Sequence, residues 1–380
     1  MGEINFFPFI VFDMKSSLFV LIMIFCLSAL GCGKSTEPTP TPGGGGTPVP
    51  VTPTPTVKKR PASLGVVGDS SNVVKTVTGG MVLMGGGTDV DAAFKWMIER
   101  SGGGDVVVIR ATGTNAYNPY IYGLGSVNSV ETLLINSKEL ANNDSVAYII
   151  RNAEMLFIAG GDQSDYMNFW RGTKVEKALN YLLTEKKAPL GGTSAGCAIL
   201  GGFYYSGENG GVTSAEALQN PYVNTMTLYN NDFLKAPYLQ NVITDQHYLT
   251  RTREGRSMVF LGRILKDWGI AAKGIAADER TAVCIAPDGK AQVYGDYSST
   301  RPYSYAYFMA TDAAKQPEKL LAYNEVMWKN GEQAVAVYEI PASVNGGGNF
   351  NVANFKFSEA TGGKAYWWWI DGGVLNKKLQ

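Results

Sequence analysis

The sequence predicts an α/β fold, with a parallel sheet flanked by helices. Short apolar runs, typical of strands buried on both faces, alternate along the chain with amphipathic helical segments. Glycine clusters at 85–87, 160–161 and 191–192 follow three of these runs. In parallel sheets of this kind, sites lie beyond the carboxyl ends of the strands, so we expect the site to lie at these glycines.

The elements follow in order along the folded part. Before the last glycine cluster we expect strands at 80–86, 105–110, within 130–135 and at 155–159, and helices at 88–101, 145–153 and 173–187. The stretch 203–239 shows no assignable periodicity. Beyond it we expect a strand at 241–244, a helix at 258–268, and β segments at 272–285 and 291–296.

The end of the chain alternates as strands do, in AVAVYEI and KAYWWWI. We therefore expect a main α/β domain over 62–310 and a β-rich C-terminal extension over 311–380. This extension is either an addition to the sheet edge or a small separate module.

Charge composition limits the kinds of partner. The 380 residues include 33 basic and 33 acidic side chains, so the formal net charge is zero. A nucleic-acid-binding protein needs a basic surface, so we expect no nucleic-acid partner. The chain has a single histidine, which narrows the search for a catalytic base.

The N-terminus resembles an export signal. Lys15 precedes an apolar run over 18–27 that is shorter than the roughly 20 residues needed to span a bilayer. The segment SALGC ending at Cys32 resembles the lipobox of bacterial lipoproteins, with Ala29 where leucine is usual. We expect residues 1–32 to be a signal peptide with Cys32 lipidated, so that the protein is exported and anchored to the bacterial membrane or cell surface.

A plain secreted protein cut near Cys32 is the alternative. Glu3 and Asp13 are unlike a signal start, so Met14 is a candidate for the true first residue. Residues 33–61 are rich in Pro, Thr and Gly and nearly without apolar side chains. Such a segment cannot bury a core, so we expect a disordered tether.

The segment 192–196 reads GTSAG and fits the G-x-S-x-G nucleophile elbow. In an elbow the serine, here Ser194, stands on a sharp strand-to-helix turn. The flanking glycines avoid collisions that a Cβ would cause. The helix that follows aims its first N–H groups at the site, where they stabilise negative charge.

A serine needs a base to take its proton, and His247 is the one histidine available. The base needs an acid to orient it. Asp278 and Glu279 are the candidates, at the end of another expected strand; we prefer Glu279, and the choice stays open. Asp245 would share a strand face with His247 but would not lie behind its ring. The order Ser, His, acid differs from that of α/β-hydrolases.

Four segments carry a family resemblance: FIAGGDQ, GGTSAG, DQHYLTRTREGR and GIAADERTA, all within 81–296. Together they resemble cyanophycinase and its relatives in serine peptidase family S51, which includes peptidase E. The resemblance implies a fold like the class I glutamine amidotransferases (flavodoxin-like), with Ser194 as nucleophile, His247 as base and Glu279 as its orienter.

The resemblance also implies the rest of the site. The oxyanion hole would use the N–H of Ala195 and one from the Gly161–Asp162 turn. The positions matching substrate-binding residues are Gln163, Asp245, Gln246, Arg251, Arg253 and Arg256. We expect no cofactor and no metal, and family members often form homodimers.

Two departures from the family pattern concern the site. Cys197 stands where the family usually has alanine, and GIAADE is longer than the family's GIDE-like form. The second departure is why the third member of the triad stays open. Cys197 lies beyond the tip of the elbow, so we expect it and Cys284 to be small core residues.

The expected function is hydrolysis of cyanophycin, a polyaspartate with arginine on each side-chain carboxyl, to β-Asp-Arg by an exopeptidase. Arginines bind carboxylates at two points, and an acid such as Asp245 suits a guanidinium. One alternative is a dipeptidase similar to peptidase E that acts on other Asp-containing peptides. Another is a non-catalytic lipoprotein that binds a ligand in the same cleft.

Overall fold

Parallel strands form the middle of the first sheet, as the alternation of apolar runs and helices predicts. The structure is a computed structural model that describes residues 60–296 and 304–380, which belong to one compact unit. The expected signal and lipid-attachment residue within 1–32 lie outside the described residues. The expected tether over 33–61 also lies outside them, apart from residues 60 and 61.

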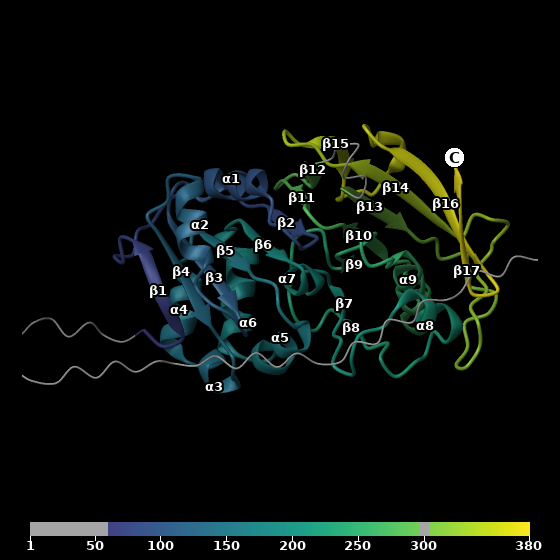
Figure 1. Ribbon diagram of the computed structural model, residues 1–380, viewed down its shortest axis with the longest axis horizontal. Helices are drawn as coiled ribbons and strands as arrows, with labels where there is room; N and C mark the ends of the chain where they lie inside the picture. Colours follow the sequence, from purple (N-terminus) through teal and green to yellow (C-terminus); the bar gives the residue numbers. More distant parts are fainter. Residues whose placement is uncertain (1–59, 297–303) are drawn as a thin grey trace, which may run out of the picture. The chain divides into compact units, whose positions relative to one another are not determined.

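The first sheet has the strand order β1-β4-β3-β5-β6-β2-β11-β12-β15 (Figure 1). Its strands are β1 (Ser63–Gly68), β2 (Met81–Met84), β3 (Asp105–Arg110), β4 (Ser129–Leu134), β5 (Met155–Ile158), β6 (Leu190–Thr193), β11 (Thr281–Ile285), β12 (Lys290–Gly295) and β15 (Gly347–Asn351). The strands from β4 to β2 are parallel, and antiparallel strands continue the sheet on both sides. The predicted α/β class is confirmed, with antiparallel strands added at each edge.

Helices cover both faces of the parallel strands. The helices are α1 (Asp91–Arg100), α2 (Tyr117–Leu124), α3 (Lys138–Ala141), α4 (Asp144–Asn152), α5 (Gln163–Trp170), α6 (Lys174–Tyr181), α7 (Ala195–Ala198), α8 (Ser214–Gln219) and α9 (Glu254–Trp268), with a π-helical turn η1 (Leu182–Lys186) and a 3₁₀ turn η2 (Phe357–Glu359). None of the helices within 60–296 and 304–380 has the length and apolarity needed to span a bilayer.

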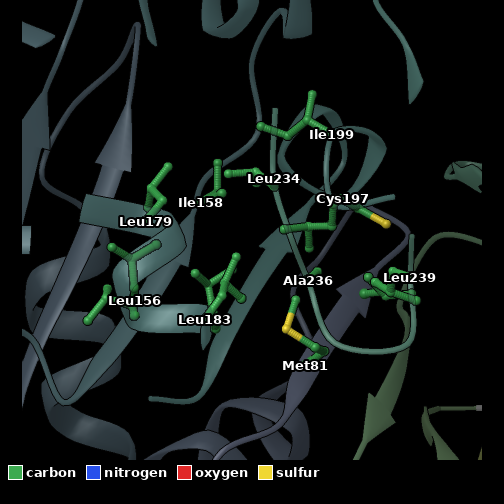
Figure 2. Packing of buried hydrophobic residues seen from close by; sticks show 14 of the residues in the cluster. Met81, Leu156, Ile158, Leu179, Leu183, Cys197, Ile199, Leu234, Ala236 and Leu239 are labelled. Carbon is green, nitrogen blue, oxygen red and sulfur yellow. The ribbon is translucent and has the colours of Figure 1, made fainter. Parts of the chain in front are cut away.

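Alternate strand residues point to opposite faces, which explains why these strands read as continuous apolar runs. In β2, Val82 joins the cluster that contains the buried side of α1, and Leu83 joins the cluster that contains α4 and α6. Figure 2 shows part of the second cluster, in which Leu156 of β5, Leu179 of α6 and Cys197 of α7 are buried. This packing fixes the parallel strands whose carboxyl ends carry the glycine clusters.

The second sheet has the order β17-β16-β14-β13-β10-β9-β7-β8. Its strands are β7 (Phe203–Tyr205), β8 (Leu228–Asn230), β9 (Val242–Asp245), β10 (Lys273–Ala277), β13 (Tyr305–Ala310), β14 (Val335–Pro341), β16 (Lys364–Asp371) and β17 (Val374–Leu379). The strands β7, β9 and β10 are parallel to one another. The buried side of α9 and the inner residues of this sheet share one apolar cluster.

The C-terminal strands belong to both sheets. β14 pairs antiparallel with β13, from Tyr305 opposite Pro341 to Ala310 opposite Ala336. The chain then crosses to the first sheet, where β15 pairs with β12, and returns to the second sheet as β16 and β17, drawn in yellow in Figure 1. Residues 311–380 are therefore β-rich, as expected, and share their sheets with the preceding chain.

Most of the expected elements are present, with shifted ends. The helix expected over 173–187 is α6 followed by the π-helical turn, and the one expected from 258 begins at Glu254. The unassigned stretch 203–239 contains β7, α8 and β8, which are short. Strand β1 and helices α2, α3 and α5 were also not predicted; α5 begins directly after a glycine turn, where Asp162 accepts a hydrogen bond from Ser164 N–H.

Candidate active site

Ser194 stands between β6 and the short helix α7, at φ 52° and ψ −119°. A positive φ with this ψ is unusual for a residue with a side chain and is typical of functional turns. A Cβ on Gly192 would lie 2.5 Å from the carbonyl oxygen of Gly196, and one on Gly196 would lie 2.2 Å from that of Ile158. The glycines flanking the serine are therefore needed for the strand–helix packing.

The structure brings together the three residues that the motifs single out. Ser194 Oγ lies 2.8 Å from His247 Nε2, and His247 Nδ1 lies 2.6 Å from Glu279 Oε1. His247 follows β9 and Glu279 follows β10, and these are adjacent parallel strands of the second sheet. Because carboxyl ends of parallel strands meet at one edge, the two side chains reach each other there.

Glu279, rather than Asp278, is the acid at the imidazole. The Asp278 side chain is fully buried, and its Oδ1 accepts hydrogen bonds from the main-chain N–H and hydroxyl of Thr250 and from the main-chain N–H of Glu279. Burial raises the pKa of Asp278 above its ordinary value, against these hydrogen bonds. The two candidate acids thus have different partners.

The glycine loop after β2 contacts both His247 and Glu279. The main-chain N–H of His247 donates to the carbonyl of Gly85 (2.8 Å), and that of Arg280 donates to the carbonyl of Gly86 (2.9 Å). A Cβ on Gly86 would lie 2.4 Å from His247 Cε1, and one on Gly87 would lie 3.0 Å from Glu279 Oε2. The glycine cluster that the sequence placed at the site therefore lies directly against the imidazole and the carboxylate.

His247 is buried, and burial lowers its pKa below the ordinary value. The hydrogen bond to Glu279 acts in the opposite direction, whereas the positive charges of Arg251 and Arg253 lower the pKa further. An imidazole with a lowered pKa is neutral at pH 7 and can accept the proton of the serine hydroxyl.

The loop 160–162, which follows β5, also approaches the serine. A Cβ on Gly160 would lie 3.3 Å from Ser194 Cβ, so this loop contacts Ser194. Gly161 and Asp162, which follow Gly160, are exposed, and the Asp162 carboxylate caps α5. Ala195 is the first residue of α7, where main-chain N–H groups have no acceptor within the helix.

Asp245 and Arg256 are paired with each other. Arg256 Nε donates to Asp245 Oδ2 (3.0 Å), Arg256 Nη2 donates to Oδ1, and Ser257 Oγ donates to Oδ2 (2.8 Å). Both charged side chains are buried. Burial alone would raise the pKa of Asp245, but the guanidinium of Arg256 holds it below the ordinary value. Asp245, which the sequence suggested for a substrate guanidinium, thus holds a guanidinium of the chain itself.

The remaining expected binding residues differ in exposure. Arg253 donates to both the main-chain and the side-chain oxygen of Gln246, and its side chain is 14% exposed. Burial lowers the pKa of Arg253 to about 10. Arg251 is exposed, and Gln163, the first residue of α5, is half-buried beside Gly207. Arg251 and Gln163 are therefore accessible to a ligand, whereas Gln246 is buried beneath Arg253.

A hollow of about 640 Å³ lies beside the glycine loop, and its residues were not expected from the sequence. Its polar lining includes Thr88, Asp89, Asp91, Lys95 and Arg280. Its lining residues Thr88 and Arg280 directly follow Gly87 and Glu279 in the chain. A volume of this size is in the range of small-molecule sites. The signal that would have found it is the glycine run after β2, which places the next residues at the same sheet edge.

Asp89 is partly buried at the edge of this hollow. Its Oδ2 accepts a hydrogen bond from the Tyr117 hydroxyl (2.6 Å). Burial raises the pKa of Asp89, and the hydrogen bond from Tyr117 opposes that shift. The hollow therefore contains both acidic and basic side chains, which suits a ligand that carries both signs of charge.

The two cysteines of the described residues, Cys197 and Cys284, are free and buried. Burial raises the pKa of each thiol well above its ordinary value. Cys197 belongs to a buried apolar cluster, as expected. A thiol that stays protonated is also a poor nucleophile. Within 60–296 and 304–380, no group of three or more His, Cys, Asp or Glu side chains could hold a metal ion.

Most of the first 300 residues of the chain match a known peptidase family. The model of Peptidase family S51 matches residues 81–293, which is more than half of the chain. The chain belongs to peptidase family S51. The resemblance seen in the four motifs is thereby confirmed.

Curated relatives and solved structures give further likenesses. The chain is 29% identical over 206 residues to a cyanophycinase of Synechococcus elongatus, which covers 52% of this chain and 57% of the relative. It is 29% identical over 175 residues to a cyanophycinase of Trichormus variabilis, covering 45% of this chain and 52% of the relative. The chain thus spans about half the length of the curated relatives it matches.

Among solved structures, a peptidase from an acI-B1 actinobacterium aligns with a TM-score of 0.44 and 16% identity. The alignment covers 61% of this chain and 91% of that protein. A putative peptidase E from Listeria monocytogenes aligns with a TM-score of 0.35 and 15% identity over 59% of this chain and all of the other. Likenesses this weak carry no argument about function.

Proposed function

We propose that this chain is a serine exopeptidase of cyanophycinase type in which Ser194, His247 and Glu279 form a catalytic triad. The observation that carries the proposal is the pair of short contacts, 2.8 Å from Ser194 Oγ to the imidazole and 2.6 Å from the imidazole to Glu279. The strained serine backbone and the lowered pKa of His247 support it. A chain that only binds a ligand needs none of these features.

In the proposed mechanism, His247 Nε2 takes the proton of Ser194 Oγ as the oxygen attacks the scissile carbonyl carbon. Glu279 accepts the Nδ1–H of the imidazole, which holds the ring in place and stabilises its positive charge. Main-chain N–H groups of Ala195 and of the 161–162 turn stabilise the oxyanion. The imidazolium then protonates the leaving amine, and a water molecule hydrolyses the acyl-enzyme by the same steps.

The proposed substrate is cyanophycin, cleaved to β-Asp-Arg. Two relatives named cyanophycinase support this substrate. The exposed Arg251 beside His247 suits substrate carboxylates. Because Asp245 is paired with Arg256, the substrate guanidinium needs another acid, and Asp89 and Asp91 line the adjoining hollow.

The experiment is to incubate the protein with cyanophycin, and separately with Asp-X dipeptides, and to identify products by mass spectrometry. We expect β-Asp-Arg from cyanophycin, and no product with Ser194→Ala. Cleavage of Asp-X dipeptides alone would instead indicate an activity similar to that of peptidase E. No cleavage of either substrate, by a protein whose Ser194 reacts with a fluorophosphonate, would reject both substrates.

We also propose export and lipid attachment at Cys32, from the lipobox-like segment that ends there. Bacteria that express the full chain should incorporate labelled palmitate into it, and Cys32→Ser should abolish the label. Secretion without incorporation would reject the anchor and leave a plain secreted protein. A homodimer stays an expectation that size-exclusion chromatography with light scattering can test.

A further inference from the structure

Asp278 is a fully buried carboxyl next to the candidate active site that takes no part in the proposed proton transfers. One of its oxygens, Oδ1, accepts three hydrogen bonds: from Thr250 N–H (3.1 Å), Thr250 Oγ1 (2.8 Å) and Glu279 N–H (2.8 Å). The other oxygen, Oδ2, is buried and has no hydrogen-bond partner among the described residues. Burying a carboxyl costs free energy unless its oxygens are hydrogen-bonded. The three hydrogen bonds to Oδ1 therefore indicate what this side chain does.

The partners of Oδ1 belong to the two halves of the base–acid pair. Thr250 lies in the turn that His247 begins, where Arg251 N–H donates to the His247 carbonyl (3.0 Å) and His247 has a φ of 47°. Glu279 is the residue whose carboxylate contacts His247 Nδ1. A single oxygen therefore connects the turn that carries the base to the main chain that carries its acid.

Asp278 is itself held in place by the rest of the fold. Its main-chain N–H donates to the carbonyl of Tyr305 in β13 (3.1 Å). Its own carbonyl packs against Gly85, where an added Cβ would lie only 1.9 Å from that oxygen. The carboxyl is thus a fixed point against which the turn and the acid are aligned.

We propose that Asp278 is a positioning residue that sets the contact between His247 and Glu279. This inference rests on the proposed function for its catalytic meaning, but the contact itself can be measured without a substrate. Among the described residues, the charged groups that shift the pKa of the imidazole most are Glu279, Arg251 and Arg253. The bond from Glu279 raises the pKa of His247, so loosening that bond lowers the pKa.

The single histidine of the chain gives a direct assay. The full chain, carrying an affinity tag without histidine, is labelled with ¹⁵N, and the imidazole signals are followed against pH by NMR. They report the pKa and the tautomer of His247. The rate at which a fluorophosphonate modifies Ser194 is measured on the same samples.

Asp278→Ala is expected to lower the pKa of His247 and to slow modification of Ser194 about tenfold or more, because the base loses its alignment. Asp278→Asn keeps an oxygen at the position of Oδ1 and places its NH₂ at the position of Oδ2, which has no hydrogen-bond partner among the described residues. It should stay within about threefold of the wild-type rate.

Glu154→Ala is the matched control. Glu154 is also fully buried; its Oε2 accepts from Asp105 N–H (2.8 Å) and its Oε1 pairs with Lys186 (2.8 Å). It precedes β5, at the end of the strand opposite to the 160–161 glycines. Its removal should lower the unfolding temperature and leave the pKa of His247 where it is.

An unchanged His247 pKa in Asp278→Ala would overturn the proposal, and so would an equal change in Asp278→Asn, which would leave only a charge effect. If Asp278→Ala does not fold, Thr250→Val removes one of the three bonds at an exposed residue. Thr250→Val should also lower the pKa of His247, and an unchanged pKa in this variant would likewise reject the proposal. A protein that cleaves no peptide would defeat the proposed function alone, since the NMR measurement needs no substrate.

Discussion

Gly86→Ala tests how closely the glycine loop sets the position of the base. The added Cβ would lie 2.4 Å from Cε1 and 2.5 Å from Nε2 of His247, whereas carbon atoms in contact lie about 3.5–4 Å apart. The imidazole ring must therefore move by about 1 Å or more, because the added Cβ is fixed to the main chain of Gly86, which is hydrogen-bonded to Arg280. Such a shift breaks the 2.8 Å contact between Nε2 and Ser194 Oγ.

A general base contributes about 10²–10⁴-fold, and a misplacement of 1 Å can cost about 10²-fold. We expect Gly86→Ala to lower both the modification of Ser194 by a fluorophosphonate and kcat on the substrate by about a hundredfold or more. The φ of +97° at this position adds a stability cost of about 1–3 kcal/mol for a residue with a Cβ.

Gly172→Ala separates the two effects. Gly172 also has a positive φ, +77°, but a Cβ there would meet no atom of residues 60–296 and 304–380 within 4 Å. This variant should show a comparable loss of stability in thermal unfolding and keep the wild-type rate. Near-normal activity of Gly86→Ala, or an equal loss of activity in Gly172→Ala, would refute the reasoning.

Three further predictions follow from the site. Ser194→Ala and His247→Ala should each lower the rate by several orders of magnitude, and the double variant should be little worse, because triad residues act as a unit; an active His247→Ala would exclude the triad, as the chain has no second histidine. The rate should fall as pH drops through a His247 pKa that lies below its ordinary value; since Arg251 lowers that pKa, Arg251→Gln should move this acid limb to higher pH, and a shift to lower pH would contradict the assignment. Cys197→Ala should keep a rate within about threefold of wild type, and iodoacetamide should not inhibit the native protein, because a buried thiol with a raised pKa is unreactive; inhibition would point to a thiol mechanism.

The parallel strands and the elbow could be predicted because their signals are local. The buried strands are short apolar runs, and the elbow around Ser194 is a motif of only five residues, 192–196. Helix α8 had a signal that was available: Thr213 and Glu216 form a capping box, with the main-chain N–H of each residue donating to the side chain of the other. Its neighbours β7 and β8 are only three residues long, and pairing with distant strands supports them.

The roles of neighbouring charged residues could not be predicted from the sequence. Asp278 and Glu279 are adjacent at a strand end, and only the direction of each side chain assigns one to His247 and the other to Thr250. Asp245 pairs with Arg256 because the turn from β9 returns the start of α9 onto the strand end. Such pairings depend on tertiary geometry.

The candidate triad is divided between the two sheets. Ser194 follows β6 of the first sheet, while His247 and Glu279 follow β9 and β10 of the second. The strand β15 joins the first sheet, although β14 before it and β16 after it both belong to the second. During synthesis, the last residue of the candidate triad, Glu279, is made about 70 residues before β15 begins. At that stage the chain has no strand that crosses from the second sheet to pair with β12 of the first. We therefore expect a ribosome-bound chain that stops at residue 310 to be inactive, so that activity develops only after the C-terminal strands have emerged.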